Sequence, residues 1–165
     1  TWSGNAHEYR LTPWRNDPVS DGCGEAFYIR DEQNGYFWSP TPLPNTGKGS
    51  YITRHGFGYS VFVHKEVGIE TELWVYVDLE KHIKFNVLKI KNTSGIPRKL
   101  SVTGYAEWVL GDLPTKNTMH IVTERRKDTS AIFAYNRYSN GFANNISFFD
   151  ADGSMQSSTA DRGEF

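Results

Sequence analysis

Residues 54–60 read Arg-His-Gly-Phe-Gly-Tyr-Ser and are the most informative string in the chain. Arg, His and Tyr offer hydrogen-bond donors, and the Tyr ring adds an apolar face. The two glycines allow a close backbone approach or a positive φ. This combination suits a polyol such as a sugar, which presents hydroxyls along its edges and C–H groups on its faces. A hairpin bend whose arginine pairs with a nearby carboxylate is the alternative interpretation.

A second polar string, residues 10–21, reads Arg-Leu-Thr-Pro-Trp-Arg-Asn-Asp-Pro-Val-Ser-Asp. This proline-stiffened segment could clamp a polar ligand or another protein, because extended arms are common at subunit contacts. An arm packed on its own domain is the alternative. Trp14 and Trp38 lie in loop-like context and are candidates for exposed indoles that stack on a sugar. We expect the other tryptophans mainly in the core.

The sequence gives less support for glycosidase catalysis, a serine nucleophile or a metal site. A glycosidase needs two carboxylates across a cleft, and the sequence cannot place its candidates relative to one another. These candidates are Asp17, Asp21, Glu25, Asp31 and Glu107. The sequence contains no G-x-S-x-G string, which would indicate a serine nucleophile. Its five histidines lack the spacing of metal ligands. We therefore expect neither a metal nor a cofactor.

Composition predicts an all-β protein. The 165 residues amount to about one domain, with 10 Phe, 9 Tyr, 5 Trp, 15 Gly and 7 Pro. The net charge of −1 creates no field that would recruit nucleic acid. A single cysteine, Cys23, excludes an intrachain disulfide.

Alternating apolar and polar residues predict most of the strands. The clearest are 59–64 and 69–77. Asn34-Gly35 predicts a hairpin turn between 26–29 and 36–38, and the prolines of 39–49 predict an extended loop. In 83–90 the apolar phase shifts, which indicates a bulge or burial of both faces. Further strands are expected at 100–110, 119–125, 131–135 and 146–149. The pattern predicts a two-layer antiparallel β-sandwich as one domain over 24–165, after an extended arm at 1–23.

Eight strings together carry a resemblance to a known family. They are residues 2–5, 10–14, 16–21, 38–44, 54–60, 92–94, 105–111 and 161–165. In this order and spacing they resemble the cyclic β-1,2-glucan synthase branch of glycoside hydrolase family 94. Cellobiose and chitobiose phosphorylases are similar but more distant in the 10–21 string. Cys23 departs from the family pattern, which has Pro or Gly there.

The resemblance implies the amino-terminal β-sandwich of that family, a supersandwich like that of galactose mutarotase. In the family a linker and an (α/α)₆ barrel follow, and the barrel holds the general-acid aspartate and the phosphate site. Because the chain has no initiator Met and no natural ending at 161–165, we expect it to be a fragment that lacks this barrel. The fragment itself is then expected to be inactive. Its parent would be a glycosyltransferase or an inverting glycoside phosphorylase.

The resemblance also assigns roles to residues. Arg54 and His55 would contact the acceptor sugar, and Tyr59 would support them. Trp14, Arg15, Asn16 and Asp17 would reach a neighbouring subunit. The implied partners are a β-glucan or gluco-oligosaccharide, the barrel of the same polypeptide and a second copy in a homodimer. The implied location is the cytoplasmic side, either within an inner-membrane protein or as a cytoplasmic enzyme. Alternatives are a stand-alone carbohydrate-binding module and a complete small hydrolase or epimerase.

Overall fold

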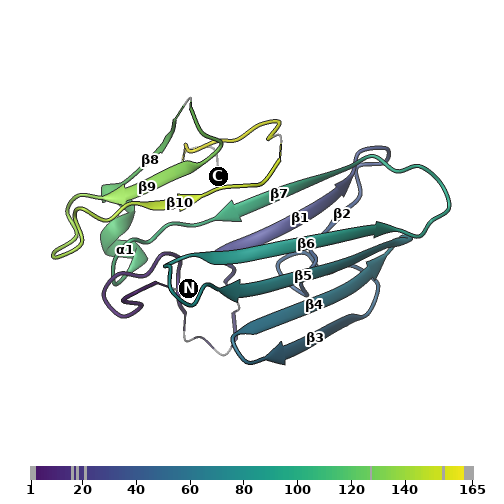
Figure 1. Ribbon diagram of the computed structural model, residues 1–165, viewed down its shortest axis with the longest axis horizontal. Coiled ribbons are helices and arrows are strands. Elements are labelled where there is room, and N and C mark those ends of the chain that lie inside the picture. The colour runs from purple at the N-terminus through teal and green to yellow at the C-terminus, as the bar shows by residue number, and fades with distance from the viewer. Residues whose placement is uncertain are drawn as a thin grey trace. The chain divides into compact units, whose positions relative to one another are not determined.

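The computed structural model describes residues 3–15, 17, 19–20, 22–126, 128–153 and 155–161, and strands dominate it (Figure 1). The predicted all-β fold is confirmed. The strand pairs β1–β2, β3–β4, β4–β5, β5–β6, β8–β9 and β9–β10 are all antiparallel. The chain divides into two compact units. The central unit is Asp17–Tyr105, and the terminal unit joins Thr1–Asn16 to Ala106–Phe165.

A four-stranded antiparallel sheet forms one layer of the central unit, in the order β3-β4-β5-β6 (Figure 1). Its strands are β3 (Tyr51–Gly56), β4 (Tyr59–Glu66), β5 (Ile69–Val77) and β6 (Lys84–Asn92). Two-residue turns join β3 to β4 and β4 to β5. In the second turn Val67 and Gly68 have φ values of 42° and 79°, which is the left-handed pair that matches the twist of a hairpin.

The second layer of the central unit is a three-stranded sheet in the order β2-β1-β7. Its strands are β1 (Glu25–Asp31), β2 (Phe37–Trp38) and β7 (Leu100–Ala106). Ile29 and Trp38 from this layer are buried together with Ile69 of β5. The two layers thus share a core, as in a sandwich. Trp38, expected as an exposed loop indole, is fully buried, because β2 turns it inward.

Strand β6 explains the shift of apolar phase at 83–90. Its register with β5 runs without a break from Ile69↔Asn92 to Val77↔Lys84, so the expected bulge is absent from this described strand. Instead, Leu88 packs inward on the core, whereas Val87 lies on the opposite face and is 39% exposed. The strand thus carries apolar side chains on both faces, and Leu88 of the inner face packs against the core that the two layers share.

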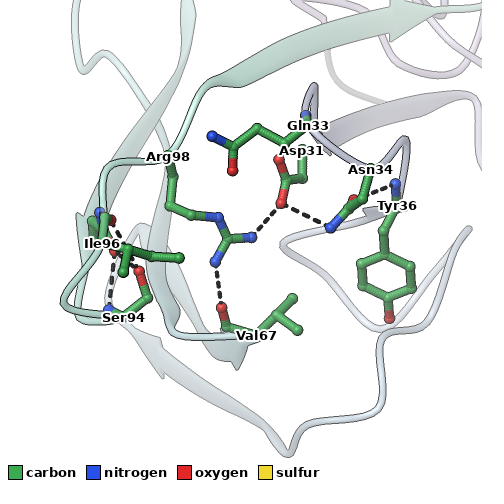
Figure 2. Close-up of polar contacts among 9 residues, drawn as sticks. Asp31, Gln33, Asn34, Tyr36, Val67, Ser94, Ile96 and Arg98 are labelled. Carbon is green, nitrogen blue, oxygen red and sulfur yellow. Dashed lines mark hydrogen bonds and ion pairs between the residues drawn. The ribbon is translucent and has the colours of Figure 1, made fainter.

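A buried ion pair joins three turns at one end of the central unit (Figure 2). Arg98 binds the carboxylate of Asp31, and its Nη1 donates to the carbonyl oxygen of Val67 at 2.8 Å. Asp31 also accepts hydrogen bonds from the Gln33 N–H at 3.0 Å and from Asn34 Nδ2 at 3.1 Å. Arg98 thereby holds the β4–β5 turn against the turn that follows β1.

Replacing Arg98 with Met is expected to lower the midpoint of thermal unfolding by about 10 °C. The buried Asp31 carboxylate would lose its cation but keep the Gln33 and Asn34 donors. Lys65→Met is the matched control, because the Lys65–Glu70 pair lies at the surface, at 2.9 Å. Calorimetry of both variants checks this, and an equal midpoint for the two would contradict it.

The terminal unit holds a smaller antiparallel sheet in the order β10-β9-β8. Its elements are α1 (Pro114–Asn117), η1 (Thr118–His120), β8 (Ile121–Arg125), β9 (Ile132–Asn136) and β10 (Ser147–Phe149). Tyr9, Leu110 and Ala134 form its buried core. The backbone pairing of Arg10 with Gly111 ties the start of the chain to this unit.

The division into an arm at 1–23 and a sandwich at 24–165 stays a prediction. Among the described residues, no helix is both long and apolar enough to cross a membrane.

Candidate functional site

The outward face of the β3–β6 sheet carries Arg54 and Tyr59, two of the predicted sugar-binding residues of the string 54–60. Because successive side chains of a strand point to opposite sides, Ile69 and Leu73 face the core while their neighbours face away. Three of the cross-strand rows on this face surround the predicted site. They are Ile52–Val63–Glu72–Lys89, Arg54–Val61–Trp74–Val87 and Gly56–Tyr59–Tyr76–Phe85.

Stacked aromatic rings form the centre of the outer face. Tyr59 stacks on Trp74 with ring centroids 5.5 Å apart and 26° between the planes, and Tyr76 stacks on Phe85 at 5.3 Å and 27°. Tyr59 is 43% exposed. Its ring lies over Gly56, where an added Cβ would come within 2.2 Å of the Tyr59 Cζ. The glycine of the string is therefore required for the ring to lie flat on the sheet.

Charged groups border the stacked rings of Tyr59 and Trp74, here called the aromatic platform. Glu72 Oε1 accepts hydrogen bonds from the Trp74 indole and from Lys89 Nζ, the latter at 3.0 Å. The bond from Trp74 and then the bond from Lys89 lower the pKa of Glu72, and the positive charge of Arg54 adds a weaker effect. Lys89 Nζ also lies 5.0 Å from the centre of the Trp74 ring. The result is an ionised carboxylate beside an indole.

Arg54 and His55 lie on opposite faces of the sheet, although they are adjacent in sequence. Arg54 shares the outer face with Tyr59. His55 points to the other side, where its Nδ1 lies 2.9 Å from Ser60 Oγ. The structure thus brings Arg54 and Tyr59, two of the three predicted sugar contacts, to the outer face. The third, His55, lies on the opposite face of the sheet.

The predicted subunit-contact residues are partly described. Trp14 is 55% exposed, with the Arg10 guanidinium 5.4 Å from its ring centre. Arg15 is exposed. Asp17 accepts hydrogen bonds from the Val19 N–H and the Ser20 hydroxyl. Asn16 lies outside the described residues.

Trp74 and Glu72 belong to the outer face, but sequence reasoning placed Trp74 with the core tryptophans. The alternation of 69–77 contained the signal, since Trp74 shares its phase with Glu70 and Glu72. A phase that carries two carboxylates indicates the solvent side of a half-buried strand.

A buried polar cluster lies on the inner face of β4. Glu66 accepts hydrogen bonds from the Gly49 N–H at 2.9 Å and from Tyr36 Oη at 3.1 Å. His64 Nε2 lies 3.3 Å from Glu66 Oε2, outside hydrogen-bonding alignment. The His64 ring stacks on Tyr51 at 3.7 Å and 2°. Burial raises the pKa of Glu66, but these donors and the charge of His64 outweigh it and hold the pKa below its usual value.

Among the carboxylates weighed for glycosidase chemistry, two lie in ion pairs. Asp31 pairs with Arg98, and Glu25 pairs with Lys84. Within the described residues, no three His, Cys, Asp or Glu side chains cluster closely enough to hold a metal ion.

Residues 1–165 match the family model described as "Glycosyl hydrolase 94, supersandwich domain". The chain belongs to this family. The match spans the whole sequence, including both units and the outer face, so the resemblance carried by the eight strings is confirmed.

Several relatives of this glycosyl hydrolase 94 chain are named enzymes. Cyclic beta-(1,2)-glucan synthase NdvB of Rhizobium meliloti (strain 1021) is 37% identical over 166 residues, which cover 100% of this chain and 6% of the relative. N,N'-diacetylchitobiose phosphorylase of Vibrio furnissii is 30% identical over 154 residues, which cover 87% of this chain and 19% of the relative. Solabiose phosphorylase of Paenibacillus borealis is 31% identical over 91 residues, covering 54% and 12%. The chain thus spans less than a fifth of the length of each of these relatives.

Proposed function

We propose that this supersandwich domain is a non-catalytic part of a larger β-glucan synthase or phosphorylase and binds a β-glucan or gluco-oligosaccharide on its outer face. The observation that carries the proposal is the stacked Tyr59–Trp74 platform between charged groups. The relatives support the enzyme class, since one is a glucan synthase and others are disaccharide phosphorylases. The chemistry of the reaction would then belong to a barrel domain of the same polypeptide.

Each part of the outer face has a role in this proposal. The C–H face of a glucose ring would stack on Trp74 and Tyr59, whose rings are already parallel to one another within 26°. Arg54, whose guanidinium makes no hydrogen bond within the described chain, would donate to ring hydroxyls. The bonds to Glu72 end on Oε1, which leaves Oε2 to accept from a second hydroxyl.

The remaining partners are proposed from the family resemblance. Trp14, Arg15, Asn16 and Asp17 would contact a neighbouring subunit of a homodimer. The exposed Trp14 indole supports this, because exposed aromatic side chains are typical anchors of interfaces. We place the domain on the cytoplasmic side of the cell, within an inner-membrane synthase or a cytoplasmic phosphorylase.

The test is a titration of the protein with β-1,2-gluco-oligosaccharides and with cellobiose, followed by the NMR signal of the Trp74 indole. We expect saturation in the millimolar range, about −4 kcal/mol. Trp74→Ala should weaken binding about tenfold, because an aromatic stacking surface of this kind contributes about 1 kcal/mol or more. Arg54→Ala should weaken it by a smaller factor.

Two further variants sharpen the test. Arg30→Ala is the matched arginine control, because Arg30 is an exposed residue of β1 in the other sheet. It should bind as the unchanged protein does. His55→Ala decides whether the third predicted residue takes part, and the outer-face proposal expects it to have no effect. Equal affinity of Arg54→Ala, Trp74→Ala and the unchanged protein would refute the proposal.

The alternative of a stand-alone carbohydrate-binding module rests on the same aromatic row. Binding by the isolated chain that does not tighten in the full enzyme would favour the module. If only the full enzyme binds, and Arg54→Ala raises its acceptor KM, the outer face acts together with the barrel.

A further inference from the structure

The terminal unit contains a cavity of about 300 Å³, separate from the outer face. Its volume lies at the lower end of the range for small-molecule sites. Three chain segments supply the polar lining, which consists of Glu8, Asp112, Asn117, Tyr138, Ser139 and Asn140. All of these residues belong to the terminal unit.

A hydrogen-bonded network fixes the first wall. Asp112 accepts from Lys116 Nζ at 2.6 Å, from the Leu113 N–H at 2.8 Å and from Asn117 Nδ2 at 3.3 Å. The bond from Lys116 is the main reason that the pKa of Asp112 is lowered to about 2. The Asn117 amide lies over Gly111, where an added Cβ would come within 2.3 Å of Nδ2. This wall is rigid and carries an ionised carboxylate.

The second wall is the loop that follows β9. Phe142 stacks on the buried Tyr9 with centroids 5.0 Å apart, and the Tyr138 ring lies 4.7 Å from that of His120. The stack of Phe142 on Tyr9 anchors the loop, whereas the Tyr138 side chain is 78% exposed. The hydroxyls of Tyr138 and Ser139 and the amide of Asn140 make no hydrogen bond in the part of the chain that is described. They therefore remain available to a ligand.

Asn136 joins the two walls. This residue is 1% exposed. Its Nδ2 lies 3.3 Å from Asn117 Oδ1 and donates to the Leu110 carbonyl oxygen at 3.1 Å, while its Oδ1 accepts from the Tyr138 N–H at 3.0 Å. A buried amide that bonds to both sides sets the width of the cavity. The site is thus formed before any ligand binds.

The lining selects the chemical class of ligand. An anion is disfavoured, because Glu8 and Asp112 both present carboxylates. An apolar ligand is disfavoured, because only Tyr138 and Phe142 offer large apolar surface. Hydroxyls, amides, carboxylates and an aromatic ring together match a neutral ring that carries several hydroxyls.

We propose that this cavity binds one neutral sugar ring, as a saccharide site distinct from the outer face. Asn140 and Ser139 would bond to ring hydroxyls from one side and Asp112 from the other, with the Tyr138 ring against a C–H face. The inference goes beyond the proposed function, since it concerns other residues in the other unit.

The test is an NMR titration of isotope-labelled protein with glucose and with cellobiose. The amide signals of residues 138–140 should shift and saturate at millimolar sugar. Asn140→Ala and Tyr138→Ala should each weaken this binding about fivefold. Both side chains are exposed, so the variants should keep the fold. Asn144→Ala is the matched control, an exposed residue of the same loop that does not line the cavity, and it should bind normally.

The same titration separates the two sites. Trp74→Ala removes the platform of the outer face, and the shifts at 138–140 should persist in that variant. Shifts confined to the Trp74 indole would overturn the cavity proposal and leave the proposed function intact. Shifts confined to residues 138–140 would overturn the proposed function of the outer face and leave the cavity proposal intact. Equal shifts with glycerol, or shifts with ethylamine but not with glucose, would overturn the cavity as a sugar site.

Discussion

Replacing Glu66 with Gln is expected to lower the free energy of unfolding by about 3 kcal/mol. The Glu66 side chain is only 5% exposed and lies beside the fully buried His64 ring. His64 Nδ1 lies 3.1 Å from the Ser50 carbonyl oxygen, which can only accept, so Nδ1 carries a proton. Glu66 itself accepts two hydrogen bonds, on Oε2 from the Gly49 N–H at 2.9 Å and on Oε1 from Tyr36 Oη at 3.1 Å. A Gln amide has only one acceptor oxygen, so one of these two buried donors would face the amide NH₂ group and lose its partner.

Equilibrium urea unfolding of E66Q measures this loss. The matched control is Glu70→Gln, from the same hairpin, because Glu70 pairs with Lys65 at the surface. That variant should unfold almost as the unchanged protein does. A second variant, Tyr36→Phe, removes only one donor to Glu66 and should cost about 1 kcal/mol. If E66Q and E70Q were equally stable, the buried pair would contribute nothing to the fold.

The same carboxylate makes stability depend on pH, with a definite sign. The pKa of Glu66 is lowered in the folded protein, so its contribution is complete above the unfolded value of about 4.3. The contribution is lost as the pH falls through the folded pKa. The stability gap between the unchanged protein and E66Q should therefore be constant from about pH 5 upward and shrink below about pH 4. A gap that grows on acidification would contradict this assignment.

Local patterns predicted most strands, because alternation and turn residues act over a few positions. The Asn34-Gly35 turn has Gly35 at a φ of 75°, and the alternation of 59–64 and 69–77 corresponds to β4 and β5. Register follows from the same patterns once the two-residue turn at Phe57-Gly58 is fixed. These features need no knowledge of distant residues.

The candidate site was predictable only in part, because it depends on contacts between strands. Sequence reasoning found Arg54 and Tyr59 but not the Trp74 that stacks on Tyr59 from β5. The cavity of the terminal unit was not predicted at all. Its walls come from residues near 8, 112 and 140, and nothing in one segment indicates the other two. Asp31 and Arg98, 67 residues apart, illustrate the same limit.

Trp38 and Trp14 looked alike in sequence, since each lies beside prolines, but their replacement should have opposite consequences. Trp38→Ala is expected to lower the free energy of unfolding by about 3–5 kcal/mol. Trp38 is fully buried, packs with Ile29 and Ile69, and stacks on Tyr36 at 5.8 Å. Removing its ring would leave a cavity between the two layers. Trp14→Ala should cost less than about 1 kcal/mol, because this indole is 55% exposed and contacts Arg10.

Trp38→Phe separates the packing of the ring from the chemistry of the indole. Trp38 Nε1 is buried and has no hydrogen-bond partner in the described chain, so phenylalanine removes an unsatisfied donor as well as volume. The lost volume destabilises, whereas the lost donor relieves a desolvation cost of about 1–3 kcal/mol. We therefore expect Trp38→Phe to cost less than half as much as Trp38→Ala in urea unfolding. Equal losses for the two variants would mean that the indole N–H is satisfied in solution, and a small loss for both would place Trp38 outside the core.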